Sequence, residues 1–280
     1  MKLIDTHQHL IYRARFGYGW TAGVPALAEG DYTVEDYDAL AGPEVAGTIF
    51  MECAVDEADY RDEARFVATL VGRGRMLGQI ASCRPEADGL GAWLDECAGL
   101  GVVGFRRVLH TEPDALSQGA VFREGIREIG RRGLVFDMCF TSAQLPLALE
   151  LADAAEGTAL VLDHCGVPDI AGAGLDPWRA HISALAERPH VTCKLSGLTA
   201  YCAPGQADLA AVGPYAAHVL DAFGADRVLW GGDWPVVDLG AGLPDWIAMT
   251  GEILAGLSEA EGAAVAHGTA TRVYAVGLPA

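Results

Sequence analysis

Short apolar runs rich in β-branched residues recur along the whole chain. Several are apolar at nearly every position, which is typical of strands in a parallel sheet that is buried on both faces. Eight such runs predict eight strands: Leu3–Leu10, Gly47–Val55, Met76–Cys83, Gly101–Leu109, Leu134–Phe140, Ala159–Gly166, Val191–Leu198 and Arg227–Val236.

The stretches between these runs are rich in Ala, Leu, Glu and Arg and have helical spacing of their apolar residues. They predict helices at Glu57–Val71, Glu86–Leu100, Gly119–Arg132, Ser142–Ala155, Pro177–Glu187 and Asp208–Phe223. Residues suited to capping a helix precede several of them: Asp56, Thr141 or Ser142, and Asp176. Pro177 suits the first position of a helix.

Eight strand–helix units without a long hydrophilic linker predict an α/β fold, a (β/α)8 TIM barrel forming a single domain over residues 1–280. The alternative is an open, doubly wound sheet. The number of units and the lack of a GxGxxG turn after the first strand argue against it. The tail beyond Ala263 is expected to form a terminal helix that closes the barrel, and His267 within it has no catalytic role.

Composition narrows the class of partner. The chain has 280 residues, 51% of them hydrophobic, and a formal net charge of −19, which disfavours nucleic acid and anionic membranes as partners. No apolar run reaches membrane-spanning length, and no signal peptide is expected before the first strand. Seven scattered cysteines without a CxxC pair are typical of a reduced, cytoplasmic protein. We expect a small-molecule substrate; the oligomeric state is not indicated.

Polar residues end almost every predicted strand, where a barrel carries its chemistry. His7 and His9 end the first strand, and their spacing places both side chains on one side of it. Imidazole is the commonest metal ligand and a proton carrier near neutral pH. The later strands end in Glu52, Ser82, Arg84, Arg106, Arg107, His110, Asp137, Asp163, His164, Lys194, Ser196 and Asp233.

The segment from Ile11 to Thr33 is a long loop rich in glycine and aromatic residues, including Tyr18 and Trp20. Long loops in compact domains are usually functional or disordered. In a barrel this loop follows the first strand and lies over the mouth of the site, so we expect a lid or pocket wall there. Its aromatic residues suit the apolar face of a sugar ring.

Five motifs carry a resemblance to a known family. They are Ile4-Asp5-Thr6-His7-Gln8-His9, Gly104-Phe105-Arg106, Leu162-Asp163-His164-Cys165-Gly166-Val167-Pro168, Cys193-Lys194-Leu195-Ser196-Gly197-Leu198 and Leu229-Trp230-Gly231-Gly232-Asp233-Trp234-Pro235. Together they resemble the amidohydrolase superfamily, and within it the sugar-lactone hydrolases such as fuconolactonase, rhamnonolactonase and pyrone-dicarboxylate lactonase. The resemblance spans residues 4 to 235.

The resemblance implies roles for particular residues. His7 and His9 match the paired histidines of the first strand, His164 matches the histidine of the sixth, and Asp233 matches the aspartate that activates water. Arg106 matches an arginine that binds the acid or hydroxyl end of a lactone. The predicted fifth strand has no histidine, and the fourth offers arginines instead of a lysine or glutamate ligand. This departure from the wider superfamily argues against a binuclear metal site.

These residues predict a hydrolase that opens a sugar-acid lactone, either an aldonolactone or a related carboxylated lactone, with Asp233 as general base. His7, His9, His164 and Asp233 would hold at most one metal ion, zinc by preference. Alternatively, protonated histidines and Arg106 polarise the ester carbonyl without a metal. Substrate contacts are expected from Arg106, Arg107, His110, Lys194, Tyr18 and Trp20. The rival functions are a metal-dependent decarboxylase of an aromatic or unsaturated acid and a non-catalytic barrel that binds a sugar or metal.

Overall fold

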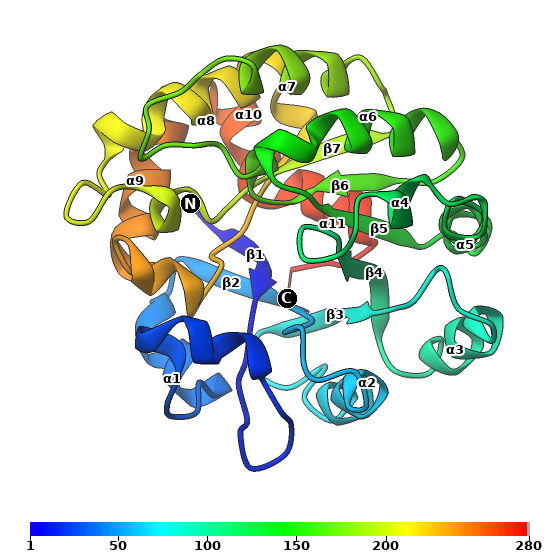
Figure 1. The fold of residues 1–280 in the computed structure, drawn as a ribbon. Coiled ribbons are helices and arrows are strands. Elements are labelled where there is room, and N and C mark those ends of the chain that lie inside the picture. Colours follow the sequence, from blue (N-terminus) through cyan, green and yellow to red (C-terminus); the bar gives the residue numbers. More distant parts are fainter. Residues whose placement is uncertain (279–280) are drawn as a thin grey trace.

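Eight parallel strands form a ring at the centre of the molecule in a computed structural model that describes residues 1–278 (Figure 1). They pair in sequence order from first to last, as a TIM barrel requires. The strands are β1 (Leu3–Gln8), β2 (Val45–Met51), β3 (Met76–Ser82), β4 (Val102–Val108), β5 (Val135–Cys139), β6 (Leu160–Leu162), β7 (Val191–Leu195) and β8 (Val228–Trp230).

The ring closes between β1 and the residues that follow β8. Gln8 forms a parallel bridge with Trp234, and the His9 amide donates to the Trp234 carbonyl at 2.8 Å. The Asp233 amide donates to the His7 carbonyl, also at 2.8 Å. The barrel prediction is therefore confirmed, and the same hydrogen bonds hold the two ends of the expected site side by side.

Helices surround the ring (Figure 1). They are α1 (Val34–Ala41), α2 (Tyr60–Ala68), α3 (Leu90–Cys97), α4 (Ala115–Gln118), α5 (Ala120–Arg131), α6 (Leu145–Ala154), α7 (Trp178–Ala186), α8 (Leu209–Phe223), α9 (Leu243–Ala255), α10 (Glu259–Ala263) and α11 (Thr269–Tyr274). Each of the six ranges predicted to be helical contains one of these helices: α2, α3, α5, α6, α7 and α8. No helix of residues 1–278 is both long and apolar enough to cross a membrane.

Two of the expected helix caps are wrong. Helix α2 begins at Tyr60, and Asp56 instead accepts a hydrogen bond from the Gly19 amide at 3.1 Å, which ties the long loop to the barrel. Helix α7 begins at Trp178, so Pro177 precedes it and Asp176 does not cap it. The Thr141 prediction is confirmed, because its side chain and Gln144 form a capping box at the start of a 3₁₀ turn that leads into α6.

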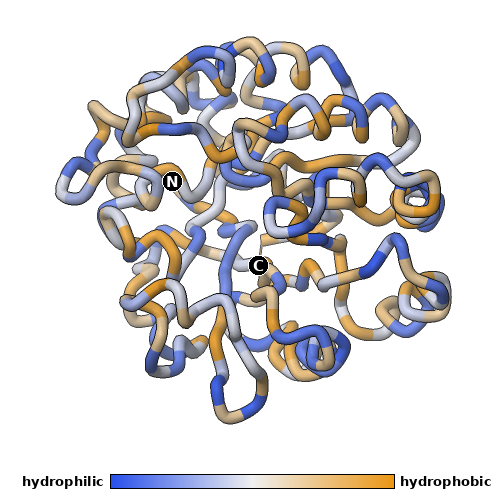
Figure 2. The backbone as a smooth tube through the Cα atoms, viewed as in Figure 1, coloured by the Kyte–Doolittle hydropathy of each residue, from blue (hydrophilic) through white to orange (hydrophobic). Residues whose placement is uncertain are grey.

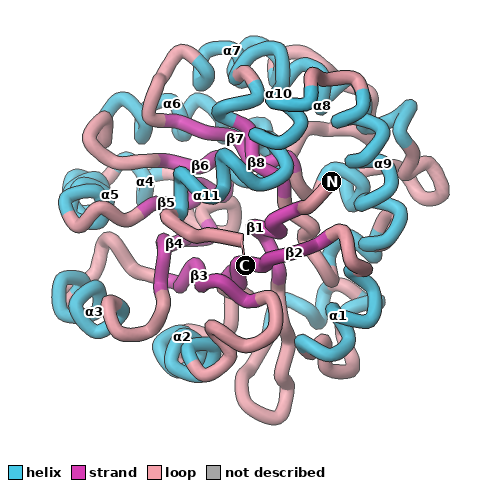
Figure 3. Tube along the Cα trace, turned by 180° about the vertical axis from the view of Figure 1, so that it is seen from behind, coloured by secondary structure: helices cyan, strands magenta, loops and turns pink. Residues whose placement is uncertain are grey.

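Apolar side chains fill the barrel interior at the end opposite the polar carboxyl ends of the strands. Inward-facing apolar residues such as Ile4, Ile49 and Leu229 form one buried cluster with Tyr274 of α11. Figure 3 shows α11 lying across this end of the barrel, which confirms the expected terminal helix. Most of the strand tube is apolar in Figure 2, whereas hydrophilic residues of β1 lie near the centre of the molecule.

Candidate functional site

A cavity of about 490 Å³ opens at the carboxyl ends of the strands. Its wall is built from strand ends and from the loops that follow them, as expected for a TIM barrel. Seven of the residues predicted for the site line it: His9, Trp20, Arg106, Arg107, His110, His164 and Asp233. His7 lies directly beneath the cavity and is fully buried.

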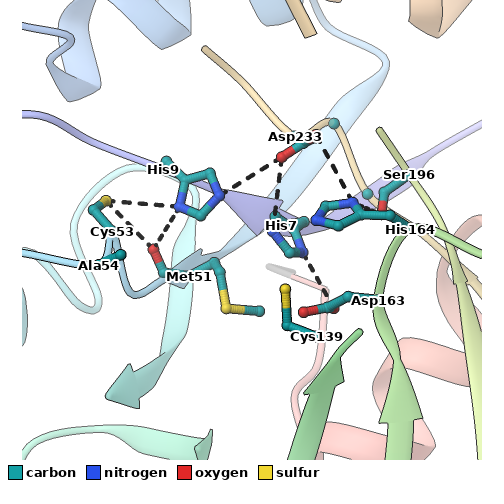
Figure 4. A network of polar contacts seen from close by, with 12 residues as sticks. His7, His9, Met51, Cys53, Ala54, Cys139, Asp163, His164, Ser196 and Asp233 are labelled. Atoms are coloured by element: carbon teal, nitrogen blue, oxygen red, sulfur yellow. Dashed lines mark hydrogen bonds and ion pairs between the residues drawn. The ribbon is translucent and has the colours of Figure 1, made fainter. Parts of the chain in front are cut away.

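Three imidazoles converge on the Asp233 carboxylate (Figure 4). His7 Nε2 and His9 Nε2 lie 3.7 and 3.6 Å from Asp233 Oδ1. His164 Nδ1 lies 3.8 Å from Asp233 Oδ2. The structure thus brings together the four residues expected to carry the chemistry, although they are far apart in the sequence.

Backbone geometry explains how these side chains reach one point. His164 and Asp233 both have positive φ angles, 53° and 58°, which is rare for residues other than glycine and turns each side chain back over the strand ends. Asp5 holds the turn after β8 in place, because its Oδ1 accepts from the amides of His7 at 2.8 Å and Gly232 at 2.7 Å. Such strained conformations persist only where the surrounding structure enforces them.

The imidazoles of His7 and His9 are oriented by acceptors on their far sides. His9 Nδ1 lies 3.0 Å from the Met51 carbonyl oxygen, and His7 Nδ1 lies 3.4 Å from Asp163 Oδ1. A carbonyl oxygen can only accept, so His9 Nδ1 carries a proton, and His9 Nε2 faces Asp233. Outer partners of this kind orient histidines that bind metals.

The donor set fits a single divalent metal ion. Ligand atoms of His7, His164 and Asp233 all lie within 4.8 Å of one another, and His9 Nε2 faces the same carboxylate. Asp233 Oδ2 is buried and has no hydrogen-bond partner among the described residues. Burial lowers the pKa of both His7 and His164, which favours the neutral imidazole that binds metals.

Arg106 is anchored by a buried ion pair. Its Nε donates to Glu52 Oε1 at 2.6 Å, and its Nη2 donates to the Glu52 carbonyl at 2.7 Å. Burial alone would raise the pKa of Glu52, but the Arg106 guanidinium and a hydrogen bond from the Ala54 amide together hold it below its ordinary value. The Nη1 atom of Arg106 lies 3.3 Å from His7 Nε2, so the guanidinium faces the same point as the histidines.

Two of the residues predicted to contact substrate, Lys194 and Tyr18, do not line the cavity. Lys194 has no exposed surface and lies below the cavity, where its Nζ contacts Asp137 Oδ2 at 2.6 Å and Asp163 Oδ1 at 3.1 Å. The sequence could not show this depth, because a lysine that points into the middle of the barrel has the same place in the strand pattern as one at its rim. Tyr18 is buried in the long loop, where its hydroxyl accepts from the Tyr12 amide.

The remaining predicted contacts lie on the cavity wall. The Trp20 indole donates to the Cys53 carbonyl at 2.8 Å, which fixes part of the long loop as a wall of the cavity. Arg107 pairs with Glu86 and Glu112, and His110 Nδ1 lies 3.2 Å from Cys139 Sγ. The structure thus places these three residues where a ligand in the cavity would meet them.

Sequence reasoning missed several wall residues, Tyr201 and Glu57 among them. Tyr201 and Glu57 line the cavity but follow the strand ends by several residues, in the loops after β7 and β2. The Glu57 carboxylate lies 2.6 Å from the guanidinium of Arg84, a residue at the end of the third strand. Their positions in loops after strands were the available signal; their side-chain directions depend on loop geometry that apolar spacing does not encode.

Comparison with known proteins shows relatives along the whole chain. Residues 4–276 match the amidohydrolase family. The chain is 33% identical to an L-fucono-1,5-lactonase of Burkholderia multivorans over 99% of its own length and 97% of the relative's. It is 31% identical to an L-fucono-1,5-lactonase of Burkholderia ambifaria, covering 88% of this chain and 85% of that protein.

Solved structures share the fold. A zinc-bound amidohydrolase from Burkholderia multivorans superimposes with a TM-score of 0.90 at 32% identity, covering 99% of this chain and 100% of the other. The 5-carboxyvanillate decarboxylase of Sphingomonas paucimobilis superimposes with a TM-score of 0.69 at 15% identity, covering 99% of each chain. The second likeness is one of fold alone.

Proposed function

The chain belongs to the amidohydrolase family, and from that premise we propose that it hydrolyses a sugar-acid lactone with Asp233 as general base. The observation that carries this proposal is the Asp233 carboxylate at the cavity wall, faced by three imidazoles and with one oxygen unpartnered among the described residues. The two L-fucono-1,5-lactonases among its relatives support an aldonolactone as the substrate.

Hydrolysis needs a base for water and a donor for the ester oxygen. Asp233 takes one proton from the attacking water, and the oxygen of that water bonds to the lactone carbonyl carbon. The ring C–O bond then breaks, and the proton on Asp233 passes to the leaving ring oxygen. The product is a hydroxy acid, which ionises in solution. In this proposal Arg106 faces the ester or a neighbouring hydroxyl, while Trp20, Arg107 and His110 bind the rest of the sugar.

We further propose that His7, His164 and Asp233, with His9 beside them, hold one divalent metal ion, zinc by preference. When bound, such an ion would supply Lewis-acid polarisation and lower the pKa of water. The zinc-bound relative supports this proposal. Burial disfavours the protonated forms of His7 and His164, so direct polarisation of the carbonyl by imidazolium groups is the weaker alternative.

A panel of sugar lactones, with L-fucono-1,5-lactone among them, tests the proposal in a pH-indicator assay. We expect acid release well above the uncatalysed rate for at least one aldonolactone. Carbon dioxide release from an aromatic acid without lactone turnover would replace the proposal with the decarboxylase alternative. Tight binding of a sugar by calorimetry without any product would replace it with a binding protein.

A further inference from the structure

Lys194 is a fully buried lysine whose role the proposed hydrolysis leaves open. Its Nζ lies 2.6 Å from Asp137 Oδ2, 3.1 Å from Asp163 Oδ1 and 3.1 Å from the Thr6 carbonyl oxygen. It also lies 3.3 Å from His7 Nδ1. Two carboxylates, a carbonyl and an imidazole around one point form the kind of donor set that binds a cation.

The surroundings of this ammonium are rigid. Asp137 also accepts from the hydroxyl of Tyr274 at 2.9 Å, and the Tyr274 ring centroid lies 5.7 Å from Lys194 Nζ. All of these side chains are buried. The ammonium therefore lies at a fixed point between the floor of the barrel and His7.

Lys194 supplies one of two buried positive charges around His7. The other is Arg106, and both cations contact the Asp163 carboxylate. The buried carboxylates in the same network are Glu52, Asp137, Asp163 and Asp233. Four buried carboxylates thus face two buried cations, and Lys194 contacts two of the four, Asp137 and Asp163.

We propose that the Lys194 ammonium is a built-in cation of this site. It occupies the point between Asp137, Asp163 and His7 at which a second metal ion would otherwise be held, and through Asp163 it positions the His7 imidazole. Lys194 is thus a positioning residue, and it keeps the site from holding more than one ion. This inference rests on the proposed metal site above Lys194.

Metal content is the direct test. Wild-type protein and Lys194→Ala are produced with added zinc, dialysed, and analysed for zinc per chain. We expect Lys194→Ala to retain one more tightly bound zinc ion than the wild type. Lys194→Ala combined with Asp137→Asn is the matched control, because it removes one donor from the vacated point, and it should lose the additional ion.

Thermal unfolding gives a second readout that does not depend on activity. Zinc should raise the Tm of Lys194→Ala more than that of the wild type, and should restore folding if the variant does not fold without it. Lys194→Met fills the space without a charge, so it should gain no additional ion, and its kcat should fall more than its KM changes.

Equal zinc content in wild type and Lys194→Ala, or a second tightly bound ion in the wild type, would overturn the inference. So would a Lys194→Ala protein that zinc cannot restore to a folded state. Lactone turnover by the wild type is measured separately. Loss of the zinc difference with normal turnover would reject the role of Lys194 alone, whereas absence of turnover would reject the proposed function.

Discussion

The position that a Cβ atom would take on Gly197 lies 2.6 Å from Nδ1 of His164. The same position lies 2.8 Å from Asp233 Oδ2. Atoms cannot approach this closely without a shift, so the absence of a side chain at residue 197 leaves the room in which His164 and Asp233 face each other.

Gly197→Ala should therefore lower zinc affinity and kcat together, because the methyl group would push His164 and Asp233 apart. Gly197 has a φ of 69°, so alanine also adds backbone strain of about 1–2 kcal/mol. Gly205→Ala is the matched control, since its φ is 73° but its Cβ would meet nothing within 4 Å. Equal effects of the two substitutions on kcat would contradict this prediction.

Replacing the proposed base should slow hydrolysis without unfolding the protein. Asp233→Asn keeps the shape of the side chain but cannot accept a proton from water, so we expect kcat to fall about 10²- to 10⁴-fold. Circular dichroism checks the fold, and Glu252→Gln on the exposed face of α9 serves as the control. Turnover of Asp233→Asn near that of the wild type would remove Asp233 from the mechanism.

Removing the metal should lower both activity and stability. A chelator that strips zinc, verified by elemental analysis, should abolish most lactone turnover and lower the Tm, because a ligand that binds only the folded state stabilises it. Added zinc should restore both. Full activity with no bound metal would instead support direct polarisation of the carbonyl by Arg106 and the histidines.

Arg106 and Glu52 should contribute to stability as a pair. Arg106→Met leaves Glu52 buried without its partner, which we expect to cost about 3–5 kcal/mol of unfolding free energy in urea. Arg106→Met combined with Glu52→Leu removes the uncompensated charge and should recover much of that loss. Recovery of kcat along with stability would show that the guanidinium does not act on the substrate.

Glu63 provides a pH-dependent prediction. Burial raises its pKa well above the ordinary value, while its Oε1 accepts from the Cys53 amide at 3.1 Å. Below an unfolded pKa of about 4.3 both states carry the proton. As pH rises above that value, the unfolded state loses the proton first, so the stability of the wild type falls until the folded carboxyl also titrates.

Glu63→Gln keeps the acceptor for Cys53 but cannot titrate, so its stability should lack this fall. The wild type should lose about 1.4 kcal/mol relative to the variant for each unit by which the pKa is raised. Urea unfolding of both proteins from pH 4 to 8 measures the difference. Parallel stability curves for the two proteins would contradict the prediction, and Glu156→Gln on the surface is the control.

The sequence predicted the barrel well because buried strands and amphipathic helices leave strong periodic patterns. It predicted strand ends less well. The run ending at Val236 was expected to be one strand, but β8 ends at Trp230 and the chain turns at Asp233, whose φ is positive. Apolar spacing carries no signal for such a turn, although the turn is what aims the carboxylate.

The sequence also did not predict how deep in the barrel each side chain lies. Lys194 and Asp233 both end predicted strands, yet one lies below His7 and the other lines the cavity. Depth depends on strand stagger, and the register between β1 and β2 shifts twice. A single sequence gives the residue types at strand ends but not their depth in the barrel, so it could not separate Lys194 from the residues that line the cavity.

Tyr274 links the last helix to the polar core through its hydrogen bond to Asp137. Synthesis proceeds from the N-terminal side, so Tyr274 leaves the ribosome long after His7 and His9. The hydrogen bond from Tyr274 to Asp137, which contacts Lys194 beneath His7, therefore forms late. The network beneath the two histidines is therefore complete only after α11 has been made and has packed against the barrel.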